Sequence, residues 1–166
     1  MRETGSGELV SVRAFLPDDV EPLRDAVAES VPELPRYETW AHAGYTSDEA
    51  AAYVNWWRRA WADGEAYYFA VLELDSGAFL GSCGLSDLVL EHRRAGLGFW
   101  IRSGRTGEGF ATDAARIVLE LGFEDLDLNR IEIDAPKGSI YDLTMSVARG
   151  GAGKSEIAEF FRERAH

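Results

Sequence analysis

Three segments with strand character follow one another between residues 66 and 103, and a glycine-rich turn comes directly after them. Residues 66–74, 78–88 and 94–103 are rich in apolar and aromatic side chains, which is typical of strands. The tripeptide DSG between the first two is a typical hairpin turn. Successive strands with short connections predict an antiparallel meander, and the remaining elements must then cover the faces of that sheet.

The segments on either side add further elements. Residues 9–15 alternate between apolar and polar side chains, which indicates a strand. Residues 17–30 are helical in pattern, and we expect Asp18 to cap this helix, with Glu21 closing a capping box. Residues 129–135 indicate one more short strand. The order β-α-α-β-β-β-loop-α-β predicts an α/β or α+β fold.

A second helix is expected over residues 46–64. Thr46 and Glu49 have the spacing of a capping box, and Gly64 is suited to end the helix. An aromatic stripe runs along it at four-residue spacing, formed by Tyr53, Trp57 and Trp61. Such a stripe is either core packing or the wall of a binding pocket, and core packing is its more frequent use.

Composition and charge exclude several classes of protein. A chain of 166 residues suits one domain. Its net charge is −12, whereas a protein that binds duplex nucleic acid normally carries a basic face. No apolar run is long enough to cross a bilayer, and the N-terminus lacks a signal-peptide core. We therefore expect a cytoplasmic protein with no nucleic-acid or membrane partner, whose acidic surface suits amines or basic peptides.

Cysteine and metal chemistry are not expected to contribute. The single Cys83 excludes an internal disulfide and fits a reducing compartment. We expect it to be a buried packing thiol rather than a nucleophile. The sequence predicts no metal site.

The turn after the meander holds three glycines, namely Gly104, Gly107 and Gly109, just before a helix expected over residues 111–123. A helix N-terminus offers unpaired amides and a partial positive charge, and glycine lets a ligand approach the backbone closely. The turn is therefore either a plain connection or a phosphate cradle. It is not a dinucleotide fingerprint, because Thr112 stands where the last glycine would be.

Taken in order, these motifs resemble the acetyl-CoA-binding core of the GNAT superfamily of N-acetyltransferases, in particular its ribosomal-protein (RimJ/RimL-type) branch. The likeness is carried by GFWIRSGRTGEGFATDAARIVLELGFEDLDLNRIEI, and upstream by VSVRAFLPDDVEPLRDAV and YVNWWRRAWADGEAYYFAVLELDSGAFLGSCGLSDL. It covers roughly residues 9–134. The resemblance implies a GNAT-like mixed, mostly antiparallel central sheet flanked by helices, in a single domain of residues 1–148.

The resemblance implies acetyl-CoA as the acyl donor. The family signature Q/R-x-x-G-x-G/A falls on residues 104–109, with Gly104 in place of the first Gln or Arg. It implies that amides from about Arg105 to Ala111 hold the pyrophosphate and that the pantetheine arm runs beside residues 99–102. The predicted cofactor-binding residues are Phe99, Trp100, Ile101, Arg102, Arg105, Thr106, Gly107, Glu108, Gly109, Phe110, Ala111 and Thr112.

The resemblance also implies acetyl transfer to a primary amine, either a protein N-terminus or a small molecule. A backbone N–H near Trp100 or Ile101 would stabilise the oxyanion. Gly96 stands where many relatives carry a glutamate that is a candidate base. The alternative bases are Glu91 and His92, acting through water, and Asp87, although each of them also fits a solvated loop residue.

Aromatic side chains are expected to frame the acceptor amine. The candidates are Tyr37, Trp40, Trp57 and Trp61. A second hypothesis stays open: a module of the same fold that binds acyl-CoA, or a protein partner, without transferring the acetyl group. Gly96 and a change in the likeness to the family after Asp134 favour this alternative, whereas the intact glycine turn favours the enzyme.

After Asp134 the likeness to the family changes. The family continues with a helix and a strand along the pantetheine, whereas this chain passes to YDLTMSV, which resembles the family's last strand. We therefore expect a fold that lacks this helix-strand segment. Residues 149–166 are expected to form a linker and a short helix, which could dock on a second subunit of a homodimer. The tail ARGGAGKSEIAEFF is not a P-loop, because Ala148 replaces a required glycine.

Overall fold

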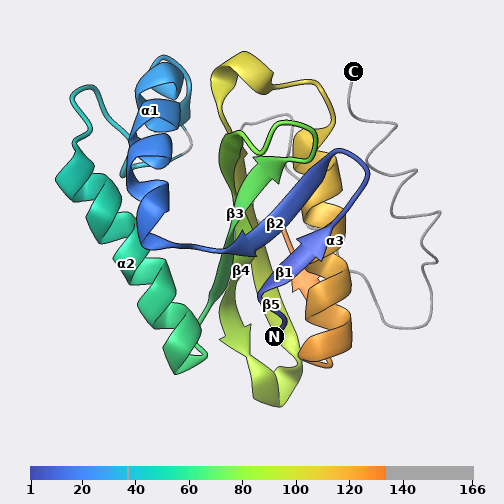
Figure 1. Ribbon diagram of the computed structural model, residues 1–166. Coiled ribbons are helices and arrows are strands. Elements are labelled where there is room, and N and C mark those ends of the chain that lie inside the picture. The colour runs from blue at the N-terminus through green and yellow to red at the C-terminus, as the bar shows by residue number, and fades with distance from the viewer. Residues whose placement is uncertain (37, 134–166) are drawn as a thin grey trace.

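The computed structural model describes residues 1–36 and 38–133, which form a sheet with helices on both faces (Figure 1). The described strands lie in the order of the chain, from β1 to β6, and neighbours are antiparallel except β5 and β6, which are parallel. The predicted meander is confirmed as β3, β4 and β5. The strands are β1 Thr4–Ser6, β2 Val10–Ala14, β3 Tyr67–Glu73, β4 Phe79–Val89, β5 Arg94–Ile101 and β6 Arg130–Glu132.

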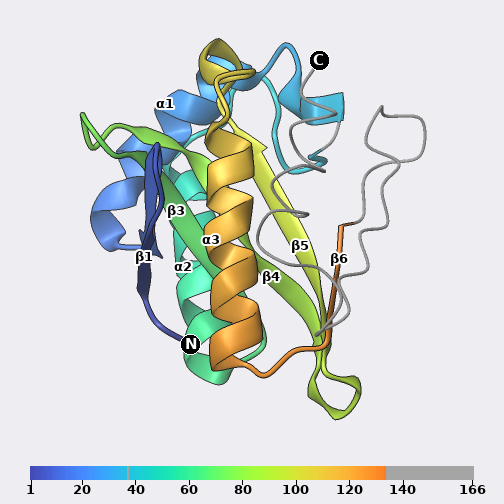
Figure 2. The same ribbon diagram turned by 90° about the vertical axis from the view of Figure 1, so that its right-hand side faces the viewer.

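Helices cover the two faces unequally. On one face lie α1 (Val20–Ser30) and α2 (Ser47–Asp63), and on the other face lies α3 (Phe110–Asp125), as Figures 1 and 2 show. This arrangement confirms the expected mostly antiparallel sheet flanked by helices. Among the described residues, no helix has the length and apolar character needed to cross a membrane.

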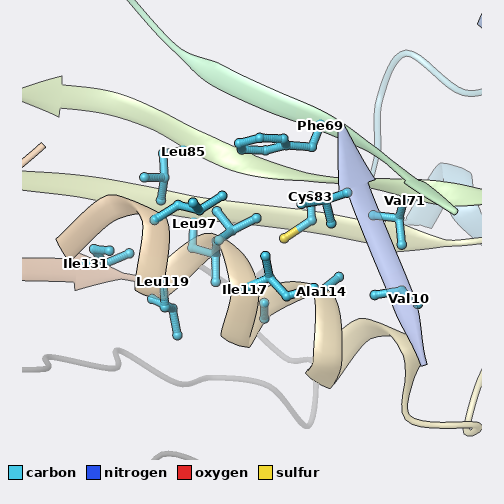
Figure 3. Packing of buried hydrophobic residues seen from close by; sticks show 14 of the residues in the cluster. Val10, Phe69, Val71, Cys83, Leu85, Leu97, Ala114, Ile117, Leu119 and Ile131 are labelled. Carbon is cyan, nitrogen blue, oxygen red and sulfur yellow. The ribbon is translucent and has the colours of Figure 1, made fainter. Parts of the chain in front are cut away.

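Two hydrophobic clusters hold these layers together, one on each face of the sheet. Because side chains alternate along a strand, Leu97 of β5 joins the cluster under α3, whereas Trp100 joins the cluster under α1 and α2. Figure 3 shows the first cluster, with Phe69 and Leu85 from the sheet facing Ile117 of α3. Cys83 is buried in it, as the sequence predicts.

The start of α1 differs from the sequence prediction. A short 3-10 turn, η1 (Pro17–Asp19), precedes the helix, so Asp18 does not cap it and Glu21 closes no capping box. The neighbouring Asp19 is buried and forms an ion pair with Arg13 of β2, with a nitrogen-to-oxygen distance of 2.7 Å. The same carboxylate accepts the N–H of Leu16 at 2.7 Å, so Asp19 combines a local backbone contact with an ion pair that ties the turn to the sheet.

The caps of α2 agree with the prediction. The Thr46 hydroxyl accepts the N–H of Glu49, and the Glu49 carboxylate accepts the N–H of Thr46 at 2.9 Å. Gly64 ends the helix with φ of 72°. The edge strand β1 was not predicted, because TGS has no apolar alternation and takes its strand form by pairing with β2.

A buried carboxylate fastens α3 to the N-terminal hairpin. The Asp113 side chain, 6% exposed, accepts the N–H of Leu9 at 2.8 Å and the N–H of Val10 at 3.1 Å. Arg116 pairs with the same carboxylate at 2.6 Å. Charged hydrogen bonds of this kind are stronger than neutral ones, so Asp113 fixes the position of the first turn of α3 against β2.

We expect Asp113→Asn to lower the free energy of unfolding by about 2 kcal/mol, because an amide keeps the shape but loses the charge that three donors share. Urea unfolding followed by circular dichroism would measure this change. Asp75→Asn is a matched control, since Asp75 lies exposed in the turn between β3 and β4. Equal stability of the two variants would contradict the assigned role of Asp113.

Candidate functional site

Strand β5 is paired along both edges only at its start. β4 pairs with it continuously from Gly96 to Ile101, whereas β6 pairs only with residues 94–96. Beyond Gly96, no residue within the described part of the chain pairs with the second edge of β5. Figure 2 shows the two strands side by side near the β4–β5 hairpin and diverging away from it. This divergence leaves a row of backbone groups available to a ligand.

The hydrogen-bond alternation identifies which backbone groups face that open edge. In an antiparallel pair, successive residues bond alternately toward one neighbouring strand and away from it. The N–H of Arg102 donates to the carbonyl of Leu80 at 2.8 Å, so the even-numbered residues of this segment, Trp100 included, bond to β4. The parallel pairing of Gly96 with Glu132 uses the N–H of Leu97, so the N–H groups that point to the open edge are those of Phe99 and Ile101.

The turn after β5 ends at a helix N-terminus with unpaired amides. Gly107 and Gly109 have φ of 81° and 88°, a backbone region that favours glycine. A side chain added at Gly107 would meet no atom within 4 Å, so this part of the turn is open. Among the described residues, no acceptor pairs with the amides of residues 107–112, whereas those of residues 104–106 are already bonded.

The two arginines of the turn already have carboxylate partners. Arg102 pairs with Glu29 of α1, and Arg105 pairs with Glu73 of β3 at 2.6 Å and with Glu108 at 2.9 Å. The Arg102 guanidinium holds the pKa of Glu29 below its ordinary value, and Arg105 does the same for the pKa of Glu73. The positive potential of the turn therefore comes mainly from its free amides and the dipole of α3.

Helix α1 holds the first residues of the same turn. The Glu29 carboxylate accepts the N–H of Gly104 at 3.0 Å, and the Ser30 hydroxyl oxygen accepts the N–H of Ser103 at 3.0 Å. The Ser30 hydroxyl donates in turn to the carbonyl of Ala26 at 2.7 Å. Glu29 and Ser30 carry no sequence signal for this role, because they come together with the turn only in the folded chain.

An aromatic cluster lies against β5 on the face that α1 and α2 cover. Trp40 lies between these helices in the chain, and its ring centroid is 4.8 Å from that of Tyr53 and 5.8 Å from that of Trp100. Trp57 of α2 stacks on Tyr68 with centroids 3.9 Å apart. Trp40 and Trp57, two of the predicted acceptor-binding residues, therefore belong to one aromatic cluster.

Other predicted residues lie elsewhere. Trp61 packs against the hydrophobic cluster under α3. Glu91 and His92 are exposed in the short turn η3 (Leu90–His92) at the tip of the β4–β5 hairpin. They lie at the opposite end of β5 from Ile101, roughly 25 Å away by the rise of a strand. The structure thus does not bring these two side chains to the predicted oxyanion donors.

Tyr37 and residues 134–166 lie outside the described residues, and so do several of the sequence predictions. Among these are the linker and terminal helix of residues 149–166 and the segment YDLTMSV. The departure expected after Asp134 lies there too.

Tyr68 is a polar group of the site that the sequence analysis missed. A side chain at Gly98 of β5 would collide with its hydroxyl, so Tyr68 lies directly over the strand. Its hydroxyl interacts with Ser86, which donates to the Asp87 carboxylate at 3.2 Å. Burial raises the pKa of Tyr68, and the phenol therefore stays protonated at neutral pH. The available signal was the glycine at position 98, which leaves room for a large neighbour.

Comparison with known proteins identifies relatives of this chain. The family model described as "Acetyltransferase (GNAT) domain" matches residues 10–138. YdaF of Bacillus subtilis (strain 168), which by name is a ribosomal N-acetyltransferase, is 29% identical over 133 residues, covering 80% of this chain and 72% of that protein.

Solved structures share the fold. A ribosomal-protein-serine acetyltransferase from Vibrio cholerae superposes with a TM-score of 0.71 at 23% identity, covering 83% of this chain and 78% of that one. RimL, a ribosomal L7/L12 alpha-N-protein acetyltransferase solved with coenzyme A, superposes with a TM-score of 0.72 at 16% identity, covering 79% and 73%. At these identities the superpositions establish the fold alone.

We expect Glu29→Gln to loosen the turn after β5. Loss of the charged acceptor for Gly104 should speed hydrogen exchange of that amide about tenfold, since a hydrogen bond to a charged group contributes about 1.5 kcal/mol. Exchange measured by nuclear magnetic resonance would test this. The control is Glu33→Gln, at an exposed position just beyond α1. Unchanged exchange at Gly104 would show that α1 does not hold the turn.

Proposed function

The chain belongs to the acetyltransferase (GNAT) family, and we propose that it transfers an acetyl group from acetyl-CoA to a primary amine of a protein N-terminus or a small molecule. The open edge of β5, continuous with the free amides at the start of α3, is the observation that carries this proposal. One extended ligand with an anionic end can use both sets of backbone donors.

The turn before α3 fits the pyrophosphate of coenzyme A. Its amides at residues 107–112 have no acceptor among the described residues, and Gly107 leaves the approach open. A helix N-terminus of this kind binds phosphate through backbone N–H groups and the helix dipole. Arg102 and Arg105 already form ion pairs, so they contribute to binding mainly by holding the turn in shape.

The N–H groups along the open edge of β5 suit the remainder of the donor. They point away from β4 at Phe99 and Ile101, as a strand-like pantetheine amide chain requires. Acetyl-CoA supplies the acetyl group as a thioester when bound. An open-edge N–H stabilises the carbonyl oxygen that gains negative charge during attack by the amine. Of the two predicted donors, Ile101 faces this edge, and Trp100 is used within the sheet.

Two features of the face of the sheet that α1 and α2 cover suit the acceptor amine. The cluster of Trp40, Tyr53, Trp57 and Tyr68 provides an apolar wall beside β5. Tyr68 stays protonated and lies over Gly98, where its hydroxyl can donate a proton to the departing sulfur. Relatives named for ribosomal proteins favour a protein N-terminus as the acceptor.

Acetyl transfer can be tested without knowledge of the natural acceptor. The protein is first titrated with acetyl-CoA by calorimetry and then mixed with acetyl-CoA and a pool of short peptides that differ in their N-terminal residue. A second pool contains small primary amines. We expect thiol release with at least one pool and a gain of one acetyl group in the product's mass. Binding without turnover would favour an acyl-CoA-binding module, and absence of binding would exclude both functions.

Gly107→Glu should abolish measurable acetyl-CoA affinity, because a carboxylate would stand in the open space where the pyrophosphate binds. Gly77→Glu is a matched control, since Gly77 also has a positive φ, 72° against 81°, and also has no atom within 4 Å of an added side chain. Both variants carry the same backbone strain of about 1 kcal/mol. Calorimetry should find normal acetyl-CoA affinity only in Gly77→Glu. Equal affinities in the two variants would show that the turn only connects β5 to α3 and does not bind the pyrophosphate.

A further inference from the structure

A pocket of ≈ 380 Å³ lies where β6 leaves β5, and its charged lining has no part in the proposed binding of acetyl-CoA. Asp87, Arg94 and Glu132 contribute its charged groups, and Gly96 forms part of its wall. The pocket is therefore located at the last residue of β5 that both neighbouring strands pair. The N–H of Leu97 still bonds to β6, so the first N–H of β5 that faces the open edge is that of Phe99.

Asp87 reaches this point because of an unusual backbone conformation. Among the described residues it is one of three non-glycine residues with a positive φ, here 51°, and it lies at the shift in register where β4 and β5 depart from regular pairing. Its Oδ2 atom lies 3.4 Å from the position that a Cβ atom at Gly96 would take. The carboxylate thus lies over the bare backbone of β5, in space that a side chain at Gly96 would share.

The carboxylate of Asp87 also has capacity for a ligand. Within the part of the chain that the structure describes, the Ser86 hydroxyl is the partner it has, at 3.2 Å. Glu132, the other carboxylate of the pocket, is already paired with Arg130 at 2.5 Å. An ionised carboxylate accepts several hydrogen bonds, so Asp87 is the acidic group in this pocket that can receive an ammonium group.

The surroundings connect Asp87 with the rest of the site. Ser86 links its carboxylate to the Tyr68 hydroxyl, and Tyr68 stacks on Trp57 of the aromatic cluster. Tyr68, Gly96 and Gly98 lie on the same face of the sheet, so an amine that enters along the aromatic cluster arrives at Asp87. The first free N–H of β5, that of Phe99, lies three residues along the strand from Gly96, so an acyl group held there by the open edge can be attacked by an amine held at Asp87.

We propose that Asp87 is a catalytic residue that binds the ammonium group of the acceptor and takes a proton from it. The inference rests on the function proposed above and assigns the base that the sequence left undecided. It also defines the acceptor as an amine that arrives protonated, as primary amines do near neutral pH.

The reaction balances with the groups named. The R–NH₃⁺ group gives one proton to the Asp87 carboxylate, and the nitrogen lone pair forms a bond to the acetyl carbonyl carbon. The carbon–sulfur bond breaks, and its electron pair leaves with sulfur. The proton that the nitrogen then sheds goes to sulfur, through the Tyr68 hydroxyl or water. The products are the acetylated amine and a thiol, and Asp87 returns its proton to solvent.

Asp87→Asn tests this role without disturbing the backbone, because asparagine tolerates a positive φ as well as aspartate does. With an acceptor found in the peptide or amine pools, kcat/KM should fall by about 100-fold or more, the lower end of the range for loss of a general base. The affinity for acetyl-CoA and the melting temperature should not change. Asp75→Asn, in the exposed turn at the other end of β4, should keep wild-type activity.

Asp87→Gly serves as a second variant, because glycine relaxes the positive φ and any loss that it shares with Asp87→Asn cannot come from backbone strain. A kcat/KM within twofold of wild type in either variant would overturn the proposal, and so would a loss that merely follows weaker acetyl-CoA binding. If the wild-type protein acetylates no member of either pool, the proposed function is refuted, and the role of Asp87 is refuted with it. The two failures are therefore distinguishable.

Discussion

The site depends on one limit in the pairing of the sheet: β6 accompanies β5 for three residues and then diverges. A strand in the middle of a sheet normally has both edges satisfied, and an unpaired edge is a place where another extended chain adds. Here the open edge begins after Leu97, at the N–H of Phe99, and leads directly to the free amides before α3. The fold therefore provides one continuous line of backbone donors from the middle of the sheet to a helix N-terminus.

Everything packed around β5 keeps that line rigid. The cluster under α3 and the cluster under α1 and α2 hold the strand from both faces. At the end of β5, Glu29 and Ser30 of α1 accept hydrogen bonds from the turn, while Asp113 fixes the first turn of α3 to β2. Donors that are held in place before a ligand arrives need little reorganisation when charge develops. The two helix layers thus act on the same short segment, although they lie on opposite faces.

Sequence reasoning succeeded where local chemistry decides the outcome. The meander, the caps of α2 and the glycine turn all follow from residues close together in the chain, and each is found in the structure. It failed where a distant partner decides. Asp18 does not take its expected capping role, because the neighbouring Asp19 starts the helix and pairs with Arg13, and Tyr68 acquires its place over Gly98 from the register of β3, β4 and β5. The site residues that belong to one segment could be predicted from the sequence, whereas those brought together by strand pairing could not.

The charge distribution explains how an acidic chain can bind an anionic donor. With a net charge of −12, long-range attraction opposes an approaching pyrophosphate. The arginines of the turn do not reverse this, because carboxylates of α1, β3 and the turn itself already neutralise them. Affinity must then come from short-range amide contacts, which act only once the ligand is seated. The same acidic field attracts a protonated amine toward the face of β5 that α1 and α2 cover, so the two substrates approach one strand through different physical forces.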